Sequence, residues 1–166
     1  MNIVEILEKQ VALMNDNNYC GNCWELHAPL EESGIDKVVL SNDNECCYHI
    51  FVVNWTKTNQ KIYDSKGAPF VSREYCAQNF TLYVLKASNM GLNVYNEALG
   101  HSLDDSKYKK IIEPLMACFS CDSFIEFCEI TGQPAEITNW TSSPVIDYLD
   151  NVYDGIRIVA GIRQEI

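Results

Sequence analysis

The sequence predicts an α+β domain, in which a short N-terminal helix and one long helix pack on a mixed, mainly antiparallel β-sheet that a closing strand completes. Three observations predict this class. Two segments repeat apolar residues at helical spacing, other segments are rich in β-forming residues that partly alternate, and polar turns separate them. The resulting order of helix, several strands, helix and strand is typical of an α+β domain.

The first helix is expected over residues 2–15, because Ile3, Ile6 and Leu7 begin an apolar stripe at three- and four-residue spacing. The polar residues 15–18 favour a turn over a helix interior, so they should end it. An irregular segment is expected to follow.

The strongest strand is expected at residues 46–56, which are rich in Tyr, Ile, Phe, Val and Trp. A turn at residues 58–60 and a return strand at residues 61–63 should complete a hairpin with it. Residues 80–87 alternate well enough for another strand. Shorter strands are expected at residues 37–40 and 92–95.

The long helix is expected from Lys107 to Glu129, where apolar residues form a broad stripe that should lie across the sheet. Pro114 removes one backbone donor, so a kink or break is expected near Ile111. The closing strand is expected at residues 155–166, with four apolar residues on one face: Ile156, Ile158, Ala160 and Ile162.

Length and composition fit one domain spanning residues 1–166. A chain of this size buries roughly two-thirds of its unfolded surface without help from a metal ion or disulfides. The chain contains no internal repeat, low-complexity tract or linker. Long loops are expected at about residues 19–36, 64–79 and 131–154.

The charge balance excludes some classes of protein. The chain has 23 acidic and 12 basic residues, for a formal net charge of −11, which disfavours a nucleic-acid-binding surface. No apolar run approaches the ~18 residues of a membrane-spanning helix, and acids stand where a signal peptide needs basic residues. We therefore expect no membrane partner, and a chain that is made and assembled in a cytoplasm.

Eight cysteines allow two interpretations. Without an export signal the thiols are expected to stay reduced and to pack as small buried hydrophobes. The alternative is a structural zinc ion at the Cys20 and Cys23 pair, completed by His27 or, from the neighbouring strand, by Cys46, Cys47 or His49. A redox role for the pair is disfavoured because it follows a helix and a polar turn. The buried thiols are the preferred interpretation, so no metal ion or other cofactor is expected.

No catalytic residue is expected, and the chain does not read as an enzyme. The three histidines, His27, His49 and His101, are far apart in the sequence and have no nucleophile motif beside them. The chain has no phosphate-cradling loop and no His-Glu-x-x-His motif.

Aromatic residues in the expected long loops are candidates for a protein interface, because such residues are enriched there. Anchoring of the last loop to the core explains those within it equally well, and the sequence leaves both interpretations open. The candidates are Trp140, Tyr148, Tyr153, Phe70 and Tyr75.

The order of the elements resembles the neck proteins of tailed bacteriophages, namely the tail-terminator and tail-completion group and related connector rings. The resemblance rests on residues 108–115 with the helix that follows, and on residues 153–158 in the closing strand. The use of Asn and Cys is also similar to that of crAss-like phages of gut Bacteroidales. In the neck families a helix packs on a mixed sheet, and identical subunits form a ring around the DNA channel.

The resemblance implies a structural virion protein, a ring-forming subunit of the head–tail connector or tail. Its partners would be copies of itself and the portal or other connector and tail proteins, and genome DNA would pass without specific binding along an acidic lumen. Two alternatives remain open. One is a small cytoplasmic binding module with zinc at Cys20 and Cys23, and the other is an acidic inhibitor that mimics DNA.

Overall fold

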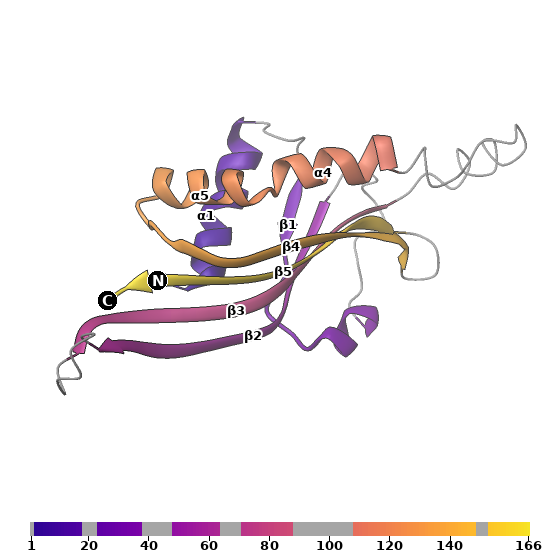
Figure 1. Cartoon of the computed structure of the whole chain (residues 1–166). Helices are drawn as coiled ribbons and strands as arrows, with labels where there is room; N and C mark the ends of the chain where they lie inside the picture. Colours follow the sequence, from indigo (N-terminus) through magenta and orange to yellow (C-terminus); the bar gives the residue numbers. More distant parts are fainter. Residues whose placement is uncertain (1, 18–22, 38–47, 64–70, 88–107, 149–152) are drawn as a thin grey trace, which may run out of the picture.

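The computed structural model describes residues 2–17, 23–37, 48–63, 71–87, 108–148 and 153–166. These residues form a five-stranded sheet with a layer of helices over one face and a short 3-10 helix on the other (Figure 1). The helical elements are α1 (Ile3–Asn17), the 3-10 helix η1 (Glu32–Lys37), the π-helical turn η2 (Tyr108–Ile112), α4 (Glu113–Cys118) and α5 (Cys121–Ile130). The strands are β1 (Trp24–Leu26), β2 (Tyr48–Tyr63), β3 (Val71–Ala87), β4 (Glu136–Asp147) and β5 (Tyr153–Glu165).

The sheet has the strand order β1-β2-β3-β5-β4. β1 pairs with β2 in parallel, and the other three pairings are antiparallel. The described residues therefore form an α+β structure with a mixed, mainly antiparallel sheet, and the expected N-terminal helix is present.

The expected hairpin turn at residues 58–60 is wrong. β2 continues to Tyr63, and Thr58 to Gln60 pair with residues 75–77 of β3. The irregularity lies earlier, at Asn54, whose φ of 53° accompanies a shift in register between Val53 and Thr56. Polar residues at 58–60 suit this strand because most of its last half is exposed to solvent while β3 satisfies its backbone.

The single long helix expected from Lys107 to Glu129 is also wrong. η2 passes directly into α4, the helix is then interrupted at residues 119–120, and α5 begins after the interruption. Ser120 caps α5, because its Oγ accepts a hydrogen bond of 3.1 Å from the backbone N–H of Ser123. Pro114 lies in the first turn of α4, and the change from the π-helical turn η2 to α4 lies next to Ile111, where an irregularity was expected. The interruption at residues 119–120 was not expected.

Two of the expected loops are largely strands. β3 begins at Val71 and so occupies much of the expected loop at residues 64–79, while β4 fills the middle of residues 131–154. The segment at residues 19–36 contains β1 and most of η1. β4 is a strand despite its polar composition because β5 pairs with it along most of its length. The short strand expected at residues 92–95, and residues 38–40 of the other, lie outside the described residues.

Two apolar clusters cover the two faces of the sheet. The larger one lies under α1, α4 and α5, and includes Ile156, Ile158, Ala160 and Ile162, which confirms the alternation expected for the closing strand. The smaller one lies on the other face, beside η1, and contains Ile35, Phe51, Val53, Tyr83, Leu85 and Tyr153. This second face carries the candidate site.

Candidate metal site

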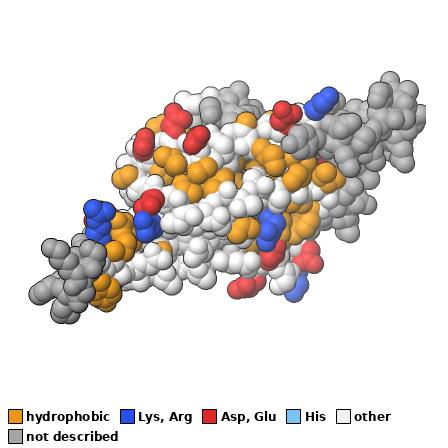
Figure 2. Space-filling view, in the orientation of Figure 1, with side chains coloured by type: hydrophobic (Ala, Val, Ile, Leu, Met, Phe, Trp, Pro, Cys, Tyr) orange, Lys and Arg blue, Asp and Glu red, His pale blue; other side chains and the backbone are white. Residues whose placement is uncertain are grey.

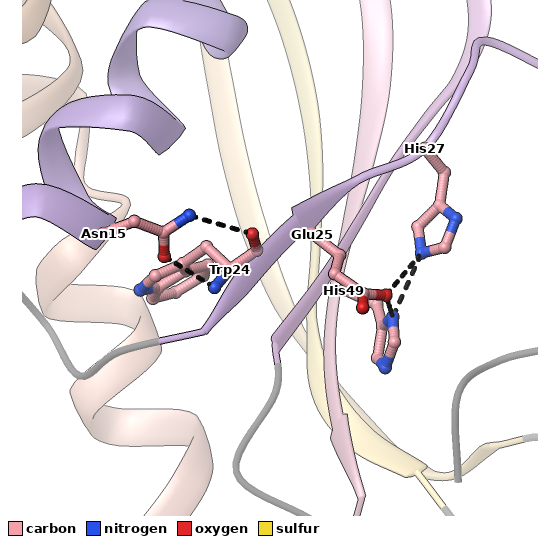
Figure 3. A network of polar contacts seen from close by, with 5 residues as sticks. All are labelled: Asn15, Trp24, Glu25, His27 and His49. Atoms are coloured by element: carbon pink, nitrogen blue, oxygen red, sulfur yellow. Dashed lines mark hydrogen bonds and ion pairs between the residues drawn. The ribbon is translucent and has the colours of Figure 1, made fainter. Parts of the chain in front are cut away.

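Glu25, His27 and His49 bring three metal-ligating side chains together on the face of the sheet opposite the helices (Figure 3). Glu25 on β1 and His49 on β2 are direct partners in the parallel pairing, so their side chains lie side by side. His27 is two residues beyond Glu25 and therefore projects from the same face. Its backbone N–H donates to the Ile50 carbonyl at 3.0 Å, which holds it along β2 past the end of β1.

The spacing of the three groups suits one shared ion. His27 Nε2 lies 3.0 Å from His49 Nδ1, and Glu25 Oε2 lies 3.2 Å from His49 Nδ1 and 4.0 Å from His27 Nε2. A tetrahedral zinc ion about 2.0–2.1 Å from each ligand atom separates neighbouring ligands by about 3.3–3.4 Å. The gap between Glu25 and His27 has to shorten, and the two gaps to His49 have to widen slightly, for all three groups to reach one ion.

The protonation state of the two histidines favours the binding of a metal cation. Burial lowers the pKa of both His27 and His49, and the Glu25 carboxylate opposes this shift without reversing it. Both imidazoles are therefore neutral at pH 7, and only one proton fits between the two facing nitrogens. Three atoms that carry lone pairs thus face one another, and a single proton between them cannot form a hydrogen bond to all three. Neutral imidazole is also the form that binds metal ions.

The scaffold around the cluster holds β1 in place. At the end of α1, Asn15 Oδ1 accepts a hydrogen bond of 2.8 Å from the Trp24 backbone N–H, and Asn15 Nδ2 donates to the Trp24 carbonyl at 3.1 Å (Figure 3). The Trp24 ring is buried and stacks on Tyr48 of β2, with ring centroids 4.2 Å apart. These contacts fix the strand that carries Glu25.

The second apolar cluster orients the two imidazoles. The His27 ring stacks on Phe51 with a centroid separation of 4.4 Å and an interplanar angle of 6°. The His49 ring meets Tyr153 edge-on at 5.8 Å. Aromatic contacts of this kind restrict ring rotation, so the facing nitrogens stay aimed at the shared space.

Of the zinc ligands proposed from the sequence, the structure describes Cys23, His27 and His49. His27 belongs to the cluster, whereas Cys20 and Cys46 lie outside the described residues. Cys23 takes part in a disulfide bond, so its sulfur has no thiolate to offer a metal ion.

The cysteines also correct the expectation of reduced thiols throughout. Cys23 and Cys118 are each disulfide-bonded, whereas Cys76, Cys121 and Cys128 are free. A disulfide depends on which sulfur atoms the fold brings within bonding distance, and spacing along the chain does not reveal this. Burial raises the pKa of the Cys128 thiol to about 11, as expected for a thiol that packs in a core.

The aromatic interface candidates make contacts within the chain. Trp140 donates from Nε1 to the Phe119 carbonyl at 3.1 Å and packs against Phe124. Tyr153 is buried, and Tyr148 stacks on Tyr83. Tyr75 is buried with the Arg163 guanidinium 4.5 Å from its ring centroid, and Phe70 lies outside the described residues. Trp140, Tyr148 and Tyr153 therefore anchor β4 and β5 to the rest of the fold.

Sequence reasoning missed Glu25 and gave His49 only a supporting role. One signal was present: residues 24–27 read Trp-Glu-Leu-His, which alternates apolar and polar residues with the period of a strand. The parallel pairing that sets Glu25 beside His49 joins residues 24 positions apart, and no local pattern encodes it.

A second polar network on the same face holds η1 against the sheet. Tyr83 Oη donates to Glu32 Oε1, and Arg157 Nε donates to Tyr83 Oη at 3.1 Å. Arg157 also lies 3.5 Å from Glu32, and Asn54 donates to Glu32 at 3.2 Å. Each of these polar groups has a hydrogen-bond or ion-pair partner within the network, so we interpret the network as structural.

None of the helices in the described residues is long and apolar enough to cross a membrane. Neither a known protein family nor a curated protein matches the sequence.

Proposed function

We propose that this protein binds a divalent transition-metal ion, with Zn²⁺ as the best candidate, through Glu25, His27 and His49. The convergence of the three ligand atoms, at separations of 3.0, 3.2 and 4.0 Å, carries the proposal. Imidazole nitrogens suit Zn²⁺ and its neighbours in the first transition row, and two histidines with one glutamate form a known zinc ligand set.

The bound ion would join β1 to β2. β1 is a three-residue strand at the edge of the sheet, so few backbone hydrogen bonds hold it there. An ion with ligands on both strands adds a bond that exists only in the folded chain, and its binding energy therefore adds to folding stability. In this role the protein is a small module that metal binding stabilises.

Isothermal titration of the metal-free protein with Zn²⁺ tests the proposal. We expect one ion per chain, and Glu25→Gln should weaken binding at least tenfold because it removes the anionic ligand. Glu74→Gln is the matched control, since Glu74 is a partly exposed acid on β3 that pairs with Lys61. Absence of stoichiometric Zn²⁺ binding to the wild-type chain would contradict the proposal.

A second candidate is the ring-forming subunit of a phage head–tail connector or tail, located in the virion. It is supported by the charge distribution along the helical layer. Asp122, Glu126 and Glu129 lie exposed on α5, which has no basic residue, whereas Lys109 lies exposed on η2 at the start of the layer. Figure 2 shows several acidic side chains over the α5 end, and at the opposite end of the layer a basic side chain beside an acidic one.

The acids of α5 and the Lys109 cation at the other end of the layer favour a head-to-tail contact between copies. Such contacts close into rings when the rotation between neighbouring copies permits. An apolar groove of about 260 Å³ at the acidic end, lined by residues of α1 and α5, would receive the neighbour. Both helices also end there without a basic residue in the last turn, so their carbonyl ends favour a cation.

Native mass spectrometry at low ionic strength tests this second function. We expect a cyclic oligomer, loss of it in Glu126→Lys, and its recovery when Lys109→Glu is added to the same chain. Monomers at every concentration and ionic strength would contradict self-assembly of the chain.

A further inference from the structure

Solvent reaches the three side chains of the Glu25–His27–His49 cluster unequally. The exposed fraction of the side chains rises from 1% for His49 to 20% for His27 and 41% for Glu25. Phe51, which stacks on His27, is fully buried, and Tyr153 covers the edge of His49. An ion held by the three groups would therefore have an apolar, aromatic wall behind it and water in front of it, on the Glu25 side.

Three protein ligands leave such an ion incompletely coordinated. Zn²⁺ and Co²⁺ take at least four ligands, and zinc sites with three protein ligands keep a water molecule in the fourth position. Among the described residues, no further His, Cys, Asp or Glu joins the cluster. Glu25, with the highest exposed fraction of the three side chains, is where water most readily reaches such an ion.

The charge of the loaded site selects the kind of ligand. A divalent ion with one carboxylate and two neutral imidazoles keeps a net positive charge. A small anion with oxygen donors satisfies both this charge and the preference of these ions for oxygen and nitrogen ligands. A neutral or cationic ligand would gain no such attraction.

We propose that the metal-loaded site carries an exchangeable water and binds a small oxygen-donor anion, a carboxylate or hydroxamate, in its place. This inference rests on the proposed metal binding and adds a ligand-binding function to it. The site would then serve to capture an acidic small molecule or an acidic side chain of another protein, in addition to joining two strands.

Titration of the full-length Co²⁺-loaded protein with acetohydroxamate tests the inference. Co²⁺ absorbs visible light in a way that depends on its ligands, so its spectrum reports both loading and ligand exchange. We expect absorption bands when Co²⁺ binds, and then a saturable change with one hydroxamate per ion. Acetamide, a neutral compound of similar size, should leave the spectrum unchanged, and Glu74→Gln should respond as the wild type does.

The outcomes separate the two proposals. If no Co²⁺ bands appear and Zn²⁺ does not bind, the proposed metal binding fails and this inference falls with it. If Co²⁺ binds but hydroxamate leaves the bands unchanged, metal binding stands and the exchangeable position is disproved. Intense thiolate-to-cobalt absorption in the near ultraviolet would identify a cysteine as fourth ligand, and would likewise overturn the inference.

Discussion

His49 Nδ1 lies 3.2 Å from Glu25 Oε2, and the two residues are direct partners in the parallel pairing of β1 with β2. Glu25 is substantially exposed, whereas His49 is buried against the second apolar cluster. The contact therefore links the edge strand β1 to the buried side of β2. A cation bound to Glu25 and His49 would hold the two strands together.

Zinc should raise the thermal stability of the wild-type protein. An ion that binds only the folded state adds about 2.7 kcal/mol at a free concentration one hundred times its Kd. We expect His49→Gln to abolish this increase, because it removes the ligand shared by both close contacts. Differential scanning calorimetry with and without Zn²⁺ measures the effect.

Gln10→Leu is a suitable control for this prediction. Gln10 is a buried polar residue of α1 whose amide atoms have no hydrogen-bond partner among the described residues, and it lies outside the ligand cluster. The variant should keep the full zinc-dependent increase. An equal increase in His49→Gln and the wild type would show that zinc binds elsewhere.

The fold was predictable where the local pattern matched the environment. β5 alternates apolar residues on one face, and each of them is buried in the core. β4 was not predictable, because its polar residues lie on an edge strand that is defined by pairing with β5. The break before α5 depends on a single cap, Ser120, inside a run whose apolar spacing continues through it.

The candidate site was only partly predictable for a similar reason. His27 stood out as a possible ligand because it follows the Cys20 and Cys23 pair closely enough to complete a zinc site with it. Its true neighbours could not be found from spacing, since Glu25 and His49 meet through a long-range parallel pairing. Cys23 illustrates the converse, because its place in a Cys-x-x-Cys pattern suggested a metal ligand, whereas its sulfur is disulfide-bonded.

The Tyr83–Glu32 hydrogen bond predicts how stability changes at high pH. Burial, followed by this bond, raises the pKa of Tyr83 to about 12, against about 10 in an unfolded chain. The folded state therefore keeps a proton that the unfolded state has lost. The contribution of Tyr83 is complete below pH ~10 and disappears as the pH rises towards 12.

Urea unfolding at a series of alkaline pH values measures this effect. The free energy of unfolding should fall more steeply in the wild type than in Tyr83→Phe, which has no phenolic proton to lose. Tyr63→Phe is the control, since Tyr63 is exposed near the far end of β2 and should follow the wild type. Parallel curves for the wild type and Tyr83→Phe would refute the prediction.

Gly155 should be far less tolerant of substitution than Gly161, although both lie on β5. A Cβ at Gly155 would overlap the backbone carbonyl of Val84, which cannot move without breaking the β3–β5 pairing. A Cβ at Gly161 would approach the side-chain ends of Thr138 and Asn79 at 2.6 and 2.8 Å, and no backbone atom is among its three nearest neighbours. We expect Gly155→Ala to cost about 3 kcal/mol and Gly161→Ala about 1 kcal/mol in urea unfolding. Equal costs would contradict this account.

Asn15 should influence metal binding without touching the metal. Its side chain satisfies both the N–H and the carbonyl of Trp24, the residue before Glu25 (Figure 3). Asn15→Ala removes both partners, and an unsatisfied, partly buried backbone group costs about 1–3 kcal/mol. The loss should fall on β1, so we expect zinc affinity to drop severalfold while the ligands themselves are unchanged.

Asn17→Ala separates this positioning effect from a general weakening of α1. Asn17 also uses its side-chain amide to bind backbone, but its partner is the Leu13 carbonyl within the same helix. Zinc titration of both variants should show weaker binding in Asn15→Ala and unchanged binding in Asn17→Ala. Raising the zinc concentration should restore much of the stability of Asn15→Ala, because the ion and Asn15 hold the same short strand. If the two variants bind zinc alike, the position of β1 does not depend on Asn15.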